Sequence, residues 1–234
     1  MLQYTTLTCF VTSRRNFSEA DRIITVFSRE RGKTQLVAKG VRRPKAKLAS
    51  SLEPFFEINL RSVQSKKMPI IIGAQPIRAL PPAAGSYEAL LCGHTLLELT
   101  ELSHDDEQVN QSWYDLSLQL FMMLGKIDPE PGYYALIQAA ALAASLKILG
   151  LTVTLPTNPH QTFFNIAEAS FSRLDRGIPV SISALKLWRF LANASPSDIA
   201  KLRQASASAL ELAPLLERFW HYHTGLTLKS KALA

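Results

Sequence analysis

The residues most suited to binding chemistry form a basic run between Ser28 and Leu48. The run contains one acid, Glu30. Its eight cations are Arg29, Arg31, Lys33, Lys39, Arg42, Arg43, Lys45 and Lys47. Like charges at this density repel one another, so the pattern favours contact with a polyanion over a merely solvated basic face. Arginine can hold a phosphate through two parallel hydrogen bonds, and lysine acts as a mobile point charge. We therefore predict a phosphate-binding surface for nucleic acid.

The positive charge is confined to the first third of the chain. The 234 residues carry a formal charge of +7, but residues 1–80 hold 15 Lys and Arg against 5 Asp and Glu, a balance of +10. The remaining 154 residues hold 11 basic and 14 acidic side chains, a balance of −3. This asymmetry is typical of a nucleic-acid-binding module joined to a part with another task.

The basic residues fall among short β-type segments. The predicted strands are Tyr4 to Val11, Arg22 to Ser28, Thr34 to Val41, Phe56 to Arg61 and Met68 to Gly73. Apolar and polar residues alternate in the fourth segment, the period of a half-buried strand. The first segment is rich in threonine and suits an edge strand. Five short strands separated by turn residues predict a small closed barrel of the OB-fold type, which binds oligonucleotides on one face.

Beyond the proline-containing stretch Pro76 to Gly85, the apolar period becomes helical. One stripe contains Trp113, Leu116 and Leu120, and a later helix is predicted from Ser183 to about Asn193. We expect an α+β multidomain protein: a five-stranded OB-fold barrel over residues 1–80, then an α-helical domain over residues 81–234. A small irregular insertion is expected near residues 151–178.

None of the other motifs in the sequence favours an enzyme. The triplet at Gly32 lacks the glycine that a phosphate-binding loop has five residues earlier, where this chain has Phe27. The residues His104 to Glu107 are interpreted as a solvated loop. No Gly-x-Ser-x-Gly motif is present. A dispersed catalytic triad stays open, but nothing in the sequence argues for one. Among the barrel aromatics, Phe17 is the best candidate for an exposed ring that stacks on a base.

Cysteine usage and the N-terminus indicate an intracellular protein. Cys9 and Cys92 are too few for a disulfide framework, and the first ten residues do not resemble a secretory signal. No cofactor and no metal are expected, because the region Leu151 to Gly177 offers His160 as its one candidate ligand of the thiolate or imidazole type.

Several segments resemble one bacterial protein family. The segments are SEADRIITVFSRERGK (18–33), VAKGVRRP (37–44), LEPF (52–55) and YHTGLTLKSK (222–231). They are similar to segments of the RecO family of recombinational repair and annealing proteins. The resemblance extends over essentially the whole chain. Many members of that family carry a four-cysteine zinc element where residues 151–177 lie here. This chain has no cysteine after Cys92, so the zinc is not carried over. We expect the hairpin itself to persist as a fold element, held by Phe163, Phe164 and Phe171.

The resemblance implies a non-enzymatic role. Such proteins bind single- and double-stranded DNA, anneal complementary strands and help to load recombinase onto protein-coated single-stranded DNA. The implied partners are RecR and the acidic C-terminal tail of single-stranded DNA-binding protein, and the implied location is the bacterial cytoplasm, at the nucleoid. An RNA-binding accessory protein is the alternative, because OB-folds also bind RNA.

The expected contacts follow from charge and position. The predicted nucleic-acid contacts are Arg14, Arg15, Phe17, Arg29, Arg31, Lys33, Lys39, Arg42, Arg43, Lys45, Lys47, Lys66 and Lys67. In the helical domain, Lys186 and Arg189 flank an apolar stripe that contains Leu185 and Trp188. A helical cation pair beside an apolar stripe suits an acidic, apolar peptide, so we expect the partner tail there.

Overall fold

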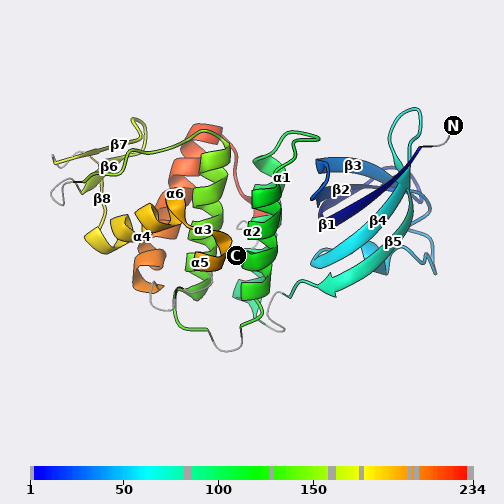
Figure 1. Ribbon diagram of the computed structural model, residues 1–234, viewed down its shortest axis with the longest axis horizontal. Helices are drawn as coiled ribbons and strands as arrows, with labels where there is room; N and C mark the ends of the chain where they lie inside the picture. The colour runs from blue at the N-terminus through cyan, green and yellow to red at the C-terminus, as the bar shows by residue number, and fades with distance from the viewer. Residues whose placement is uncertain are drawn as a thin grey trace. The chain divides into compact units, whose positions relative to one another are not determined.

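The computed structural model describes residues 3–81, 86–126, 129–157, 162–173, 177–199, 202 and 206–230. The chain divides into two compact units. Unit 1 contains Met1–Gly85 and Thr100–Gly125, and unit 2 contains Ser86–Leu99 and Lys126–Ala234. Unit 1 is built on a β-barrel, and unit 2 is mainly helical (Figure 1). The predicted fold class, an OB-fold barrel followed by a helical region, is confirmed.

Five strands form the closed barrel, in the order β1-β2-β3-β5-β4. Their bounds are β1 Tyr4–Asn16, β2 Arg22–Ser28, β3 Gly32–Ala38, β4 Phe56–Val63 and β5 Ile70–Ala79. A short helix, η1 (Ser50–Leu52), lies between β3 and β4. Buried aliphatic side chains from every strand fill the interior, among them Leu7, Ile24, Leu36, Ile58 and Ile71. In β4 such side chains alternate with the exposed Asn59 and Arg61, the period of a strand with one buried face, whereas every residue of β2 after Arg22 is buried.

Strand β1 is not an edge strand, so that expectation was wrong. Its first half pairs with β4 and its second half with β2, and the register shifts between Val11 and Ser13. A strand that serves two neighbours in this way must bend, and a β-bulge permits the bend. On the other side of the barrel, β3 meets β5 at the single parallel pair Val37–Ile70.

A segment from the helical half of the sequence completes unit 1. The end of α1 (Tyr87–Leu102) leads into a loop and then α2 (Gln111–Met123), whose first turn is capped by Asn110 accepting the Trp113 N–H. The Phe10 ring of β1 lies 5.6 Å from the Tyr114 ring and 5.5 Å from the Phe121 ring, both on α2. Helix α2 therefore covers one end of the barrel core.

A buried carboxylate strengthens this contact. Glu57 on β4 is 5% exposed. Its carboxylate accepts a hydrogen bond from the Tyr114 hydroxyl at 2.9 Å and forms an ion pair with Arg78 at 2.5 Å. Burial, and next the neighbouring Glu57 carboxylate, raises the pKa of Tyr114. Both oxygens of the buried acid thus have donors, which is the condition for burying a charge at tolerable cost.

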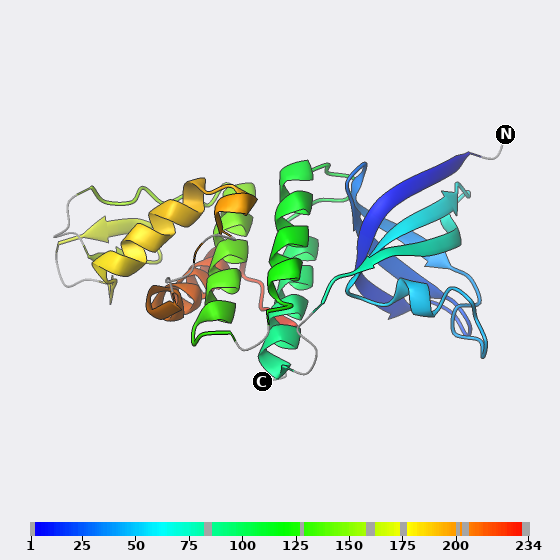
Figure 2. The same cartoon turned by 60° about the horizontal axis from the view of Figure 1, so that its bottom comes forward.

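Unit 2 is organised around α3 (Tyr133–Ile148) and α6 (Ser206–Thr224), which pack on each other. The alanine-rich α3 permits close approach, and Trp220 on α6 donates its indole N–H to Ser145 Oγ at 2.9 Å. This unit also contains α4 (Ile182–Asn193), α5 (Pro196–Ile199) and most of α1. Figure 2 shows α4 and α6 beside α3.

The expected insertion contains a three-stranded sheet, in the order β7-β6-β8. Its strands are β6 Phe163–Asn165, β7 Ser170–Ser172 and β8 Ile178–Pro179. The Phe164 ring is fully buried and contacts the rings of Phe171, Trp188 and Phe219. The residues that the structure describes contain no group of three potential metal ligands, and His160 lies outside them. None of the described helices is long and apolar enough to cross a membrane.

Candidate nucleic-acid interface

Strand β3 divides the basic run of residues 28–48 into two sets. Gly32 begins the strand and Ala38 ends it. A strand rises about 3.3 Å per residue, so its two ends lie roughly 20 Å apart. The turn cations Arg29, Arg31 and Lys33 are therefore at one end of β3, and the loop cations that follow Ala38 are at the other. Although the turn cations and the loop cations are adjacent in sequence, β3 separates them, so they do not form one patch.

The turn cations are engaged within unit 1 by acids of the segment Thr100–Gly125. Arg29 lies 3.4 Å from Asp115, and Arg31 pairs with Glu107. Lys33 Nζ lies 3.6 Å from an Asp106 carboxylate oxygen and donates to the Glu101 carbonyl at 3.1 Å. Only 16% of the Lys33 side chain is exposed. We infer that these cations hold the barrel and the segment together.

The interpretation of residues 104–107 as a solvated loop was wrong in part. His104 is buried, with its ring 4.7 Å from the Phe27 ring and 5.3 Å from the Trp113 ring. Its Nδ1 lies 3.0 Å from the Thr100 carbonyl oxygen, and burial lowers the pKa of the imidazole. The acids that follow are exposed, yet two of them form the ion pairs just described.

The opposite end of β3 is where three loops of the barrel meet. Strand β2 begins here at Arg22, which pairs with Asn16, the last residue of β1, and with Ala38, the last residue of β3. The β1–β2 and β3–β4 loops therefore leave the barrel side by side. The β4–β5 loop joins them, because the Val37 N–H donates to the Pro69 carbonyl at 2.9 Å. We call this end of the barrel, with its three loops, the open end.

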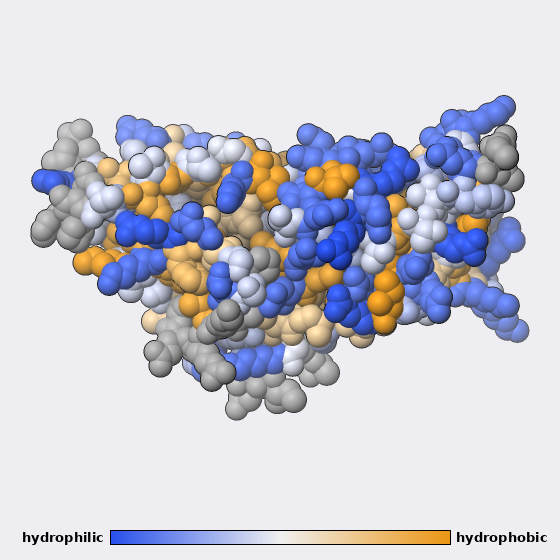
Figure 3. Space-filling model, in the orientation of Figure 1, coloured by the Kyte–Doolittle hydropathy of each residue, from blue (hydrophilic) through white to orange (hydrophobic). Residues whose placement is uncertain are grey.

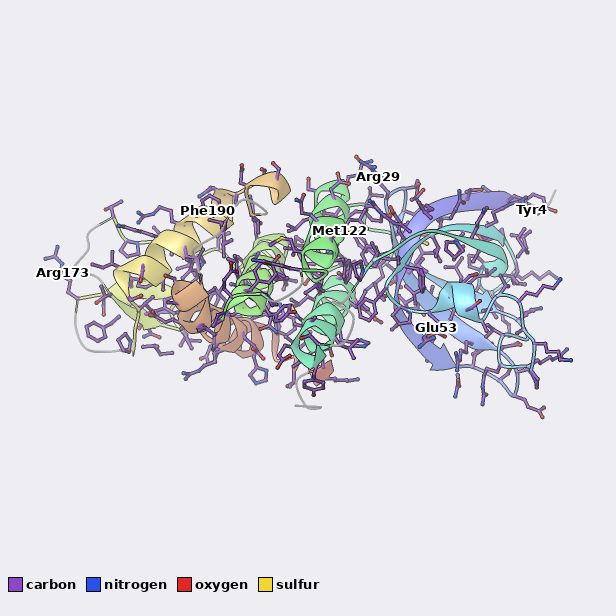
Figure 4. All side chains as sticks on the ribbon, turned by 90° about the horizontal axis from the view of Figure 1, so that it is seen from below. Tyr4, Arg29, Glu53, Met122, Arg173 and Phe190 are labelled. Carbon is purple, nitrogen blue, oxygen red and sulfur yellow. The ribbon has the colours of Figure 1, made fainter. Side chains whose placement is uncertain are left out.

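Exposed cations gather at the open end. The β3–β4 loop is hollowed, with a volume of about 430 Å³ lined by residues 39–41 and 43–48. The exposed candidates on the three loops and the end of β1 are Arg15, Phe17, Lys39, Arg42, Arg43, Lys45, Lys47, Lys66 and Lys67. Phe17 is 56% exposed, which suits a stacking ring. Figure 3 shows hydrophilic side chains projecting from this part of the barrel, and Figure 4 shows nitrogen-tipped side chains near the labelled Glu53. Arg14, the thirteenth candidate, pairs with Glu53.

A second candidate site lies in unit 2. A hollow of about 360 Å³ is bordered by two cations, Lys147 at the end of α3 and Arg189 on α4. Its apolar lining includes Ala143, Leu146, Leu151, Val153, Leu155 and Trp188. Arg189 also donates to the Pro156 carbonyl at 2.6 Å, which holds its guanidinium at the border.

The structure separates the two predicted tail-binding cations. Arg189 lines the hollow, whereas Lys186 is exposed on the same helix and is not among the lining residues. Sequence reasoning paired Lys186 with Arg189 and did not find the hollow or its second cation, Lys147. The two cations of the hollow are 42 positions apart in sequence, so no local pattern could have paired them.

Comparison with known proteins agrees with the fold. Residues 1–80 match the family model for the N-terminal part of recombination protein O, and residues 84–232 match the model for its C-terminal part. A DNA repair protein RecO of Moorella thermoacetica is 24% identical over 95% of this chain and 87% of that protein. A DNA repair protein RecO of Bifidobacterium longum subsp. infantis is 33% identical over 58% of this chain and 59% of that relative. The chain belongs to the recombination protein O (RecO) family, whose matched relatives are named as DNA repair proteins.

Proposed function

We propose that this protein acts in DNA repair and recombination by binding single- and double-stranded DNA at the open end of its barrel and annealing complementary strands. The carrying observation is that three loops bring exposed lysines and arginines, together with Phe17, to one end of an OB-fold barrel. We propose residues 1–80 as the DNA-binding domain and residues 81–234 as the partner-binding domain. The site of action is the bacterial cytoplasm, at the nucleoid.

The proposed annealing needs no bound nucleotide. Two complementary strands repel each other through their phosphates, and cations between them lower that repulsion. The open-end lysines and arginines contact phosphates, while Phe17 stacks on an unpaired base. None of these contacts reads a base edge, so binding is expected to tolerate changes of sequence.

The proposed partners are RecR and the C-terminal tail of single-stranded DNA-binding protein, which together permit the loading of recombinase. The hollow in unit 2 supports the second of these. An acidic tail with apolar side chains would place its carboxylates at Lys147 and Arg189 and its apolar groups against the aliphatic lining. Lys186 is retained as a solvated cation beside this site. We assign no surface to RecR.

The test is a titration of the protein against labelled single-stranded DNA, duplex DNA and matched RNA at several salt concentrations. We expect log affinity to fall linearly with log salt, by about 0.7 per phosphate contact on a single strand. We also expect complementary DNA strands to anneal faster when the protein is present. Salt-independent binding, or tighter binding to RNA than to DNA of the same sequence, would count against the proposal.

A further inference from the structure

The β1–β2 and β3–β4 loops of the open end are joined by hydrogen bonds that sequence reasoning did not foresee. The Gly40 N–H donates to the Asp21 carboxylate at 2.7 Å. The Arg42 N–H donates to the Ala20 carbonyl, and its guanidinium donates to the Ser18 carbonyl, both at 3.0 Å. These three hydrogen bonds join residues 18–21 of the β1–β2 loop to residues 40–42 of the β3–β4 loop. We call this set of contacts the clasp.

Asp21 is the centre of this clasp. Its backbone carbonyl accepts the Phe17 N–H at 3.1 Å, which closes the β1–β2 loop beneath the exposed Phe17 ring. Its side chain holds Gly40, which has φ of +66°, a conformation that favours glycine. The Gly40 carbonyl in turn accepts the Arg43 N–H at 3.1 Å. One residue thus links the candidate stacking ring to the candidate phosphate contacts.

An acid at this position needs an explanation, because it weakens the positive potential that phosphates require. An aspartate among Arg42, Arg43, Lys39 and Lys45 reduces their attraction for a polyanion. Its carboxylate, however, accepts a backbone N–H at a short distance, and such a charge-assisted hydrogen bond is stronger than a neutral one. The contact attaches the start of a 17-residue loop, 39–55, in which the sole regular element is η1, to the β1–β2 loop.

We propose that Asp21 is a positioning residue of the interface: its carboxylate fixes the β3–β4 loop against the β1–β2 loop, so that Phe17 and the loop cations contact the same DNA strand. This inference rests on the proposed DNA-binding function. It adds a role for an acid that would otherwise only oppose binding. Loop residues that are ordered before binding lose less conformational entropy when the strand arrives.

Two substitutions separate positioning from charge. Asp21→Asn and Asp21→Ala both remove the negative charge, but only Asn keeps an oxygen that can accept the Gly40 N–H. If charge alone matters, both variants bind single-stranded DNA equally well, and more tightly than the natural protein. If Asp21 positions the loop, Asp21→Ala binds at least threefold more weakly than Asp21→Asn, and its salt slope falls by about 0.7, the equivalent of one lost phosphate contact.

Gly40→Ala tests the same clasp from the other loop and serves if Asp21→Ala does not fold. An alanine at Gly40 meets no close atom, because the nearest is Arg43 Cδ at 3.7 Å, but it is strained at this φ. We expect it to reduce affinity and salt slope as Asp21→Ala does, with the unfolding transition retained. Equal affinities and slopes for Asp21→Asn and Asp21→Ala, or for Gly40→Ala and the natural protein, would overturn the inference. Failure of the natural protein to bind DNA with a salt slope would instead overturn the proposed function.

Discussion

The division of the basic run by β3 can be tested with two matched triple substitutions. The first, Arg43, Lys45 and Lys47 to Ala, removes three exposed cations from the open end. The second, Arg29, Arg31 and Lys33 to Ala, removes three cations that pair with acids of the segment Thr100–Gly125. Both variants change the net charge of the protein by the same amount, so only the position of the lost charges differs.

The expected magnitudes follow from the number of phosphate contacts. Losing three contacts lowers the slope of log affinity against log salt by about 2, since each contributes about 0.7 on single-stranded DNA. The affinity at 50 mM salt divided by the affinity at 200 mM salt would then be smaller by a factor of roughly 20 than the same ratio for the natural protein. The turn variant should alter the slope by less than about 0.7, the contribution of one contact. It should instead lose stability, about 0.2–1 kcal/mol for each of the two more exposed ion pairs.

The assay is fluorescence anisotropy with a labelled single strand over that salt range, with the unfolding transition of each variant measured in parallel. The expected pattern is a flattened slope with normal stability for the open-end variant, and the reverse for the turn variant. Equal flattening by both variants would refute the reasoning, because it would mean that total charge, rather than its place on the barrel, determines binding.

Three further predictions concern other parts of the molecule. Because the pKa of Tyr114 is raised, the folded state keeps a proton that the unfolded chain releases near pH 10. The contribution of this group to the free energy of unfolding is therefore fully present below that pH. Above it, the free energy of unfolding falls by about 1.4 kcal/mol per pH unit. Chemical unfolding at pH 8 to 11 should show that Tyr114→Phe removes this part of the decline, and an unchanged decline would contradict the assignment. Reversing Lys147 and Arg189 to Glu should abolish binding of an acidic tail peptide in calorimetry while sparing DNA binding, whereas Lys186→Glu, the control on the same helix, should have little effect; equal losses would place the groove elsewhere. Purified, chelator-washed protein should contain no stoichiometric zinc by elemental analysis, and one zinc per chain would contradict this.

Much of the fold was predictable because local pattern determines it. Strand β2 has the predicted bounds, and the predicted helix from Ser183 to about Asn193 is α4, Ile182–Asn193, capped by the Ser181 hydroxyl. Strand β5 extends beyond the predicted Gly73 to Ala79, through Pro76. The proline was taken as a boundary, but the β4–β5 register shifts next to it, and an irregular pairing tolerates a missing N–H.

The partner of α2 could not be predicted from its own pattern. Hydrophobic periodicity indicates that a helix face is buried, but it does not say against what. Tyr114 and Phe121 pack on Phe10 of the barrel, whereas this helix was expected to belong to a separate α-helical domain of residues 81–234. One signal was available: the acids Asp106, Glu107 and Asp115 complement the basic turn of residues 29–33. Without coordinates, that complementarity cannot be told from solvated charge.

The candidate site was predictable by composition but not by arrangement. Thirteen residues were assigned to one interface, and the structure places nine at the open end, pairs Arg14 with Glu53 and engages the three turn cations elsewhere. Whether the nine contact DNA stays a prediction. The clasp at Asp21 had no sequence signal, because a single acid beside basic residues commonly reflects nothing more than surface charge balance.

The placement of Thr100–Gly125 in unit 1 has a consequence for synthesis on the ribosome. All five strands have been translated once residue 80 is made, yet the segment that covers Phe10 and Phe27 is complete only near residue 125. At about 5–20 residues per second, translating those 45 residues takes roughly 2–9 s. For that interval the nascent barrel carries an uncovered aromatic end, and Glu57 has Arg78 but not yet Tyr114 as a partner. Chaperones that bind exposed apolar surface on nascent chains would bind at this end of the barrel. Slow codons after position 80 should lengthen the interval and lower the yield of folded protein.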